Sequence, residues 1–492
     1  MIPGTQTITE AWRNPLNPDF VLAAGVSALR SALAVGLLLT AYFARSSPTL
    51  AVAFPVVLVC GIVGWMLFQF PLLNLGVLLT SFILIADYQE GTQITEVLWG
   101  LYYAAFMAHW YITRMLMYRD RLFEDRESRS LFLFLVLMTL SVGLTIMFKG
   151  DLRFFLGEWL SLSFFSFYFP IREAITRHRH GLRVIVISLL IVATLVQVRN
   201  ILNYQQILIE ATYAWQVTKG RAVTNTAVIM VPLFGSLLML LHARKLKPAL
   251  LAGGIFAFFF AGFILSQTRG HWVAFAFACL VIFPVLGRAE RYRLVSVGAL
   301  SVAGIVGLGF LFLGEAFQLV AAGIVDRVIS IGSAASDDIS LINRFRETKV
   351  VMGKVLQNPI LGYGPGVKFG FWDLSYLPPF THQTSFLHNG FVALWYKFGI
   401  WGLGLVLYFW GAAIRRGIRV YHSAAPDSLR VAGLSASALL IAFGVSASTS
   451  NPFYVNDTMF VFAAVMGIGA GVSQRGMPIA AAQTPGSSEQ AG

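Results

Sequence analysis

Charge is scarce in this 492-residue chain, in which only 12% of the residues are charged and 57% are hydrophobic. The mean hydropathy is +0.72. A soluble domain carries about twice that share of charged residues. Because the apolar residues also come in long runs, the composition excludes an ordinary soluble domain and predicts an integral membrane protein.

Cysteine is nearly absent, and Cys60 and Cys279 both fall inside predicted membrane spans, so no disulfide framework is expected. The polar start MIPGTQTITEAWRNP has no apolar core before a cleavage site, and we expect no removable signal peptide. The net charge of +13 is spread over many short loops. That distribution argues against a nucleic-acid partner, which would require basic residues gathered on one domain.

Apolar runs of roughly 20 residues can cross a hydrocarbon core of about 30 Å. We predict an all-α, polytopic membrane helix bundle of about 12–14 spans, which takes the lipid bilayer as a partner. The candidate spans are 20–43, 49–67, 72–86, 97–117, 131–148, 154–170, 183–199, 226–242, 249–266, 271–287, 292–314, 387–411, 429–449 and 458–474.

Arginine and lysine concentrate in one alternating set of loops, which contain residues 114–129, 172–183, 244–247, 288–293 and 415–430. Short basic loops stay in the cytoplasm, so this pattern predicts that both termini are cytoplasmic. Five parts follow: a cytoplasmic segment (1–19), a multi-span bundle (20–314), a large extracytoplasmic loop (315–386), the C-terminal spans (387–474) and a disordered cytoplasmic tail (475–492).

The loop 315–386 is far longer than an ordinary connection, and such loops are usually functional or disordered. Its aromatic, glycine and proline content favours a folded, partly helical cap. An amphipathic helix is predicted over 344–358, ending before Pro359. The turn GYGPG contains Gly362, Gly364 and Gly366, for which we expect a role in backbone geometry.

Several polar residues fall on the same predicted extracytoplasmic side. Arg269 lies at the helix end in SQTRG, Arg344 and Arg346 belong to the loop helix, and His388 and Asn389 open the next span. Guanidinium groups suit bidentate contacts with phosphate, and a neutral histidine can accept a proton from a hydroxyl. Together they predict group transfer from a diphosphate-linked donor to an alcohol.

Three separated motifs resemble the bacterial O-antigen ligase and polymerase family: NPILGYGPG (358–366), HNG followed by a helix ending KFGIWGLG, and the upstream TRG. The resemblance implies a glycosyltransferase C-like membrane enzyme. It would transfer a glycan from undecaprenyl diphosphate to a glycan or lipid-linked sugar acceptor on the periplasmic face of the inner membrane. It implies no cofactor and no metal, and a chain-length regulator protein as a candidate partner.

By motif position, the resemblance assigns acceptor activation to His388 and diphosphate binding to Arg269 and to Arg344 or Arg346. Side chains two positions apart on a helix point in different directions. We therefore favour Arg344 as the phosphate-binding residue and expect Arg346 to be solvated. Asn389 and the glycines of the turn would support the site. Family members often carry an acidic residue at the position of Lys397, which is predicted to lie on the helix face opposite His388.

Other interpretations remain open at this point. Arg269 could anchor a helix at the headgroups, and Arg199 and Arg221 could either extend the basic site or act as such anchors. Glu158, inside a predicted span, needs a polar partner that the sequence does not identify. Rival functions are attachment of glycan to lipid A-core, a metal-dependent transferase using Asp87 and Glu90, and a flippase for lipid-linked oligosaccharide.

Overall fold

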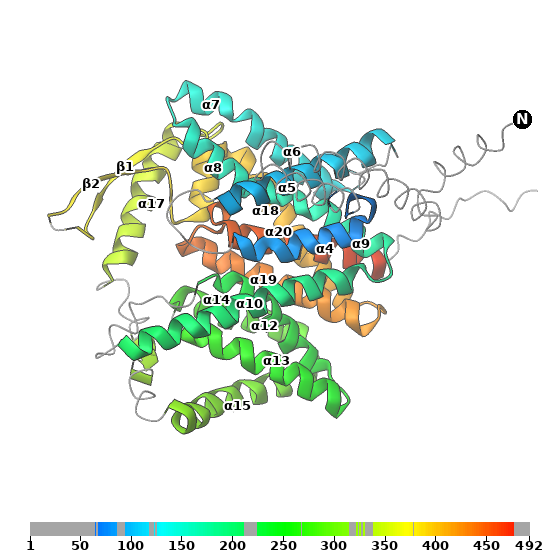
Figure 1. Ribbon diagram of the computed structural model, residues 1–492. Helices are drawn as coiled ribbons and strands as arrows, with labels where there is room; N and C mark the ends of the chain where they lie inside the picture. The colour runs from blue at the N-terminus through cyan, green and yellow to red at the C-terminus, as the bar shows by residue number, and fades with distance from the viewer. Residues whose placement is uncertain are drawn as a thin grey trace, which may run out of the picture.

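The structure is a computed structural model that describes residues 64, 67–85, 94–117, 123, 125–210, 224–266, 268–313, 321–322, 324–325, 328–329, 338–376 and 378–476. The described part is mostly helical (Figure 1). The first predicted span and nearly all of the second lie outside the described residues.

The helices of the bundle are α4 (Pro71–Ser81), α5 (Ile94–Ile112), α6 (Arg126–Leu140), α7 (Val142–Met147), α8 (Leu152–Ser163), α9 (Tyr168–Arg177), α10 (Gly181–Glu210), α12 (Thr226–His242), α13 (Leu246–Leu265), α14 (Arg269–Ile282), α15 (Arg288–Leu313), α18 (Gly390–His422), α19 (Asp427–Thr449) and α20 (Asn456–Gly476). Short 3-10 turns extend several of them, and a π turn follows α5. Each predicted span from 72–86 onward overlaps one of these helices, which confirms the polytopic helix bundle.

Seven stretches of the described residues are long and apolar enough to cross a membrane, and three shorter apolar helices accompany them. Two helices are longer than predicted: α10 continues to Glu210 rather than ending near 199, and α18 continues to His422 rather than ending near 411. The reason is that a helix does not stop where hydropathy falls. Its hydrogen-bonded turns extend into polar surroundings until a capping or breaking residue ends them.

Helix α20 lies at the centre of the bundle, where it packs against α9, α18 and α19 (Figure 1). Nearly nine tenths of its apolar window is buried. Gly467 and Gly471 allow the close approach of α9, because a Cβ added at either position would stand 2.8 Å or 2.7 Å from Ile171 or Ile175. Small residues spaced four apart are a common means of packing membrane helices backbone to backbone.

A cap stands at one end of the bundle (Figure 1). It consists of α17 (Ile339–Gln357) and an antiparallel hairpin of β1 (Phe369–Asp373) and β2 (Phe380–Thr384), paired with Phe369 opposite Thr384. The helix predicted at 344–358 therefore begins earlier, at the N-cap Asp338, and the hairpin was not predicted. Val351, Val355 and Phe369 form a small apolar core with Ala393 and Tyr396 of α18, so the cap is seated on the helix that follows it.

Candidate functional site

The first turn of α17 is joined to the start of α14. One carboxylate oxygen of Asp338 caps α17 by accepting hydrogen bonds from the backbone N–H groups of Ser340 (2.9 Å) and Leu341 (3.3 Å). The other oxygen pairs with the guanidinium of Arg269. Burial alone would raise the pKa of Asp338, but the hydrogen bond and charge of Arg269, with the two backbone donors, lower it below its usual value.

In the second turn of α17, Arg344 reaches the end of α19. Its Nη1 donates a hydrogen bond of 2.8 Å to the carbonyl oxygen of Thr449, the last residue of that helix. Thr449 also lies beside α14, because a Cβ added at Gly270 would stand 3.8 Å from the Thr449 hydroxyl. Arg269 and Arg344 are therefore brought to one neighbourhood where α14, α17 and α19 meet.

Arg346 differs from Arg344 in its surroundings. Arg344 is half-buried, whereas Arg346 is exposed to solvent on another face of α17. The two side chains project in different directions because consecutive helix positions are rotated by about 100°. Only Arg344 faces the helix ends that carry Arg269 and Thr449.

Glu347 connects α17 to His388, which immediately precedes α18. The Glu347 Oε2 atom lies 2.8 Å from His388 Nδ1 and 3.3 Å from the His388 backbone nitrogen. The Glu347 side chain is 5% exposed and that of His388 is 35% exposed. Because a carboxylate only accepts hydrogen bonds, Nδ1 is the nitrogen that donates to Glu347, and in the neutral tautomer that makes this contact Nε2 keeps its lone pair. The imidazole is thus oriented with a basic nitrogen directed away from its buried partner.

Asn389 has a local task. Its side-chain oxygen accepts a hydrogen bond of 3.1 Å from the backbone N–H of Val392, so it is the N-cap of α18. A capped helix start holds the preceding residue at a defined position. Asn389 therefore supports the placement of His388 and uses its own amide oxygen in doing so.

The glycine-rich turn inserts into a break in α18. Gly362, Gly364 and Gly366 all have positive φ, and so does Gly399, which interrupts the helix. The backbone N–H groups of Tyr363 and Gly364 donate to the carbonyls of Tyr396 (2.8 Å) and Lys397 (2.9 Å). A Cβ at Gly399 would stand 1.9 Å from the Ile360 carbonyl oxygen, so a side chain there cannot be accommodated.

A buried ion pair fastens this junction. Lys397 is fully buried, and its Nζ lies 2.5 Å and 2.6 Å from the two carboxylate oxygens of Glu158 in α8. Lys397 also donates to the Ser385 carbonyl (2.7 Å), and Glu158 accepts from the backbone N–H of Gly366 (3.1 Å). The partner that Glu158 requires is therefore Lys397. The ion pair has a structural role, because its two side chains join α8, the glycine-rich turn and the end of the cap.

Arg199 belongs to a second polar network at the same end of the bundle. Its Nη2 donates to Asn225 (2.6 Å) and Thr224 (3.1 Å) at the start of α12, and Asn225 in turn donates to Asp457 of α20 (2.9 Å). Arg221 lies outside the described residues, as do Asp87 and Glu90. In the described part of the chain no group of three or more His, Cys, Asp and Glu side chains could hold a metal ion.

Sequence reasoning missed Asp338 and Glu347, the two carboxylates that contact Arg269 and His388. Asp338 is the N-cap of α17, and Glu347 lies within that helix. For Glu347 the available signal was its position three residues after Arg344, which places the two side chains on neighbouring parts of the helix surface. The structure joins Arg269 and His388 indirectly, through the two ends of a ten-residue stretch that runs from the N-cap Asp338 to Glu347 of α17. An imidazole that is about one third exposed can remove a proton, and guanidinium groups anchored to the same helix can stabilise developing negative charge.

Part of the chain, including this site, is similar to a known protein family. Residues 254–407 match the family described as O-Antigen ligase. The matched segment includes α14, the cap and the first half of α18, and thus Arg269, Arg344, Glu347 and His388. No curated protein matches the chain.

Proposed function

Because residues 254–407 are an O-antigen ligase family domain within a multi-pass membrane protein, we propose that the chain is a membrane glycosyltransferase. It transfers a glycan from undecaprenyl diphosphate to a sugar hydroxyl. The reaction takes place on the periplasmic face of the inner membrane, where the cap and His388 lie if both termini are cytoplasmic.

The proposed reaction inverts the anomeric carbon. His388 Nε2 accepts the proton of the acceptor hydroxyl, and the oxygen attacks the anomeric carbon opposite the diphosphate. As the new glycosidic bond forms, the bond from that carbon to the diphosphate oxygen breaks, and its electron pair leaves with the diphosphate. Arg269 and Arg344 stabilise the negative charge that develops there. No metal is required, because the guanidinium groups supply the positive charge.

The contacts with Asp338 and Thr449 hold the two arginines in place, and each contact engages one nitrogen of a guanidinium. A guanidinium is planar and carries five N–H donors, so it can contact more than one acceptor at once. A preorganised cation loses little freedom when it binds an anion, which favours stabilisation of the transition state.

The single observation that carries this proposal is the contact of 2.8 Å between Glu347 Oε2 and His388 Nδ1. It orients the imidazole with Nε2 as the basic nitrogen, and it comes from the same helix that carries Arg344. A histidine that merely ended a membrane helix would need no buried carboxylate to orient it.

We propose that the product is a polymerised surface or secreted polysaccharide, so that the enzyme is an O-antigen or exopolysaccharide polymerase. Ligation to lipid A-core is the second candidate, favoured by the description of the matching family. The two reactions share donor and leaving group and differ in the acceptor. A deletion strain separates them on gels. Loss of long glycan chains indicates polymerisation, whereas accumulation of long undecaprenyl-linked chains not attached to lipid A indicates ligation.

The test of the transferase itself is His388→Ala in protein reconstituted into liposomes with a lipid-linked glycan donor. Removing a general base lowers the rate by roughly 10²–10⁴-fold. His382→Ala is the matched control, since His382 lies in the hairpin against Phe371 and Tyr376. We expect this variant to retain activity. Unchanged transfer by the His388 variant would refute the mechanism, and loss of wild-type activity in chelator would favour a metal-dependent one.

A further inference from the structure

A large cavity lies at the end of the bundle opposite the cap. Its volume is about 720 Å³. Asp427, Ser428 and Leu429 at the start of α19 line it, whereas Thr449 at the other end of the same helix contacts Arg344. The 23 residues of α19 span roughly 33 Å, about the thickness of a hydrocarbon core. The cavity is therefore separate from the proposed transfer site.

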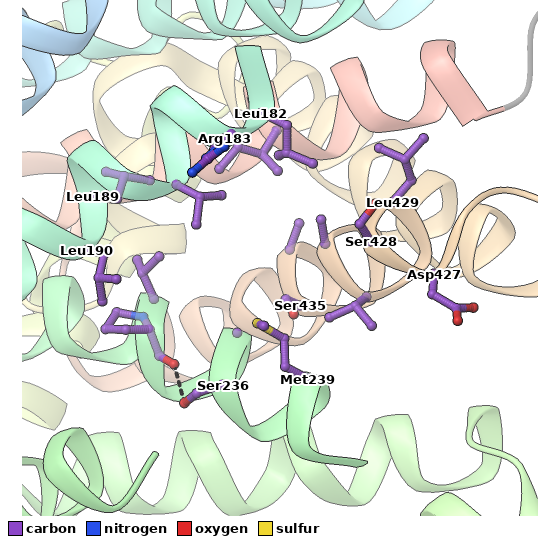
Figure 2. A pocket seen from close by; sticks show the side chains of 18 of the residues that line it. Leu182, Arg183, Leu189, Leu190, Ser236, Met239, Asp427, Ser428, Leu429 and Ser435 are labelled. Atoms are coloured by element: carbon purple, nitrogen blue, oxygen red, sulfur yellow. Dashed lines mark hydrogen bonds between the residues drawn. The ribbon is translucent and has the colours of Figure 1, made fainter. Parts of the chain in front are cut away.

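The interior of the cavity is apolar. Leu189 and Leu190 of α10, Met239 of α12 and Leu439 of α19 line its wall, and Figure 2 shows the leucines of α10 across from Met239 and the first turns of α19. The hydroxyl of Ser236, also in the wall, is turned to the Pro232 carbonyl at 2.6 Å. Such a lining suits hydrocarbon and offers few hydrogen bonds to a sugar. The volume falls within the range of roughly 300–1,000 Å³ typical of ligand sites.

The rim of the cavity is basic. Arg179, His180 and Arg183, at the turn before α10 and in its first turn, line the cavity and are exposed. Arg475 of α20 also lines it and donates to the backbone carbonyls of Ile175 in α9 and of Arg179 in the turn that follows. Among the described lining residues Asp427 is the one carboxylate, and it pairs with Arg430 at 3.2 Å. The rim therefore presents an excess of positive charge directly above an apolar chamber.

We propose that this cavity binds an anionic phospholipid. An acyl chain occupies the apolar chamber between α10, α12 and α19, and the phosphate of the headgroup meets Arg179 and Arg183. The combination of charge and lining selects this occupant. A soluble anion would leave the apolar wall uncovered, and a zwitterionic lipid would leave the excess positive charge uncompensated. Basic residues beside the cytoplasmic leaflet attract anionic lipids by about 1 kcal/mol each. The bound lipid fills the space that α10, α12 and α19 leave between them, although α12 packs directly against α10 and α19 at other positions.

The experiment uses the full-length protein in nanodiscs containing phosphatidylglycerol and phosphatidylethanolamine, with bound lipid measured by native mass spectrometry. The wild type retains phosphatidylglycerol preferentially. Arg179→Gln and Arg183→Gln each weaken retention roughly fivefold, the factor corresponding to about 1 kcal/mol per basic residue. Arg244→Gln is the charge-matched control, because Arg244 is exposed at the same end of the bundle and does not line the cavity.

A second variant tests the chamber independently of charge. Gly235 lines the cavity, and a Cβ added there meets no atom within 4 Å, so Gly235→Leu fills the chamber without a clash at its base. Gly254→Leu is its control, since Gly254 is equally open and lies outside the cavity. Gly235→Leu loses bound phosphatidylglycerol and Gly254→Leu keeps it.

Three outcomes would overturn the proposal: equal retention of phosphatidylethanolamine by the wild type, unchanged retention in Gly235→Leu, or a mass that identifies an isoprenoid lipid or a peptide as the occupant. The measurement does not depend on the proposed glycan transfer. A protein without transferase activity would still give the same lipid retention.

Discussion

His388 and Glu347 differ in exposure, and the difference assigns them different tasks. His388 is about a third exposed and can meet an acceptor, whereas Glu347 is buried beneath it and contacts the ring from behind. In the proposed mechanism Glu347 is therefore a positioning residue, which acts through the imidazole and does not touch the reacting atoms.

Substituting Glu347 tests this relation. Glu347→Gln keeps an oxygen that can accept from Nδ1, so it retains more activity than Glu347→Ala. Glu347→Ala lowers kcat by about 10- to 100-fold, by analogy with other residues that orient a functional histidine. The KM for both substrates changes little. Steady-state kinetics in liposomes give the two constants, and a loss confined to KM would contradict a positioning role.

Arg344 and Arg346 form a natural matched pair for a second prediction. Arg344→Lys replaces the planar fork by a single ammonium and lowers kcat/KM for the lipid donor by about 100-fold, the order of one lost contact to a developing charge. Arg346→Lys changes it little, because Arg346 is exposed away from the helix ends. Kinetics at varied donor concentration measure the effect. Equal losses in the two variants would mean that Arg346 also contacts the donor.

At the scale of elements, α17 is the scaffold of the site. Its N-cap pairs with α14, its second turn contacts the end of α19, and its third turn orients His388 before α18. One helix, α17, thus contacts three helix ends from distant parts of the chain. If α17 shifts, Arg344 and the orientation of His388 shift with it.

The pairing of Asp338 with Arg269 predicts a pH dependence of how firmly α17 is seated. The pKa of Asp338 is lower in the folded protein than its ordinary value of 3.8. The contribution of the pair to stability is therefore complete well above pH 3.8 and is lost as pH falls through the lower folded pKa. Since both side chains are about one fifth exposed, the contribution is about 1 kcal/mol at most.

The substitution Asp338→Asn tests how much the charge of Asp338 contributes to seating α17. Asparagine caps a helix about as well as aspartate, so the variant keeps the cap of α17 and loses only the charge. Resistance of the cap to limited proteolysis, measured in detergent from pH 7 to pH 3, falls on acidification in the wild type and falls less in the variant. An identical pH dependence in the two proteins would show that the charge of Asp338 does not hold α17 in place.

At the scale of the whole molecule, the ion pair of Lys397 with Glu158 joins the cap to the bundle. Breaking it leaves an uncompensated charge among apolar side chains. Lys397→Met and Glu158→Gln each lower the free energy of unfolding by about 3–5 kcal/mol. Thermal unfolding in detergent ranks the stabilities of the wild type and the variants. The double variant Glu158→Leu/Lys397→Met recovers part of the loss, because no charge remains buried, but the Gly366 N–H and the Ser385 carbonyl still lack partners. Additive losses in the double variant would argue against coupling of the two side chains.

The sequence alone determined the polytopic helix bundle, the end of α17 before Pro359, and the resemblance on which the transferase assignment depends. These features are local. Membrane insertion acts on runs of about 20 apolar residues, and proline acts on its immediate neighbours. The β1–β2 hairpin escaped prediction because its strands are short and their pairing depends on the apolar core beneath the cap.

Only the tertiary structure decided which polar groups meet. Glu347 and His388 lie 41 positions apart, Asp338 and Arg269 lie 69 apart, and Glu158 and Lys397 lie 239 apart. A charged side chain in an apolar setting must find a partner, so its presence in the sequence is a signal, but any of several opposite charges could satisfy it. Helix packing selects one of them, because the chain returns to the same end of the bundle many times and only close packing sets which ends become neighbours.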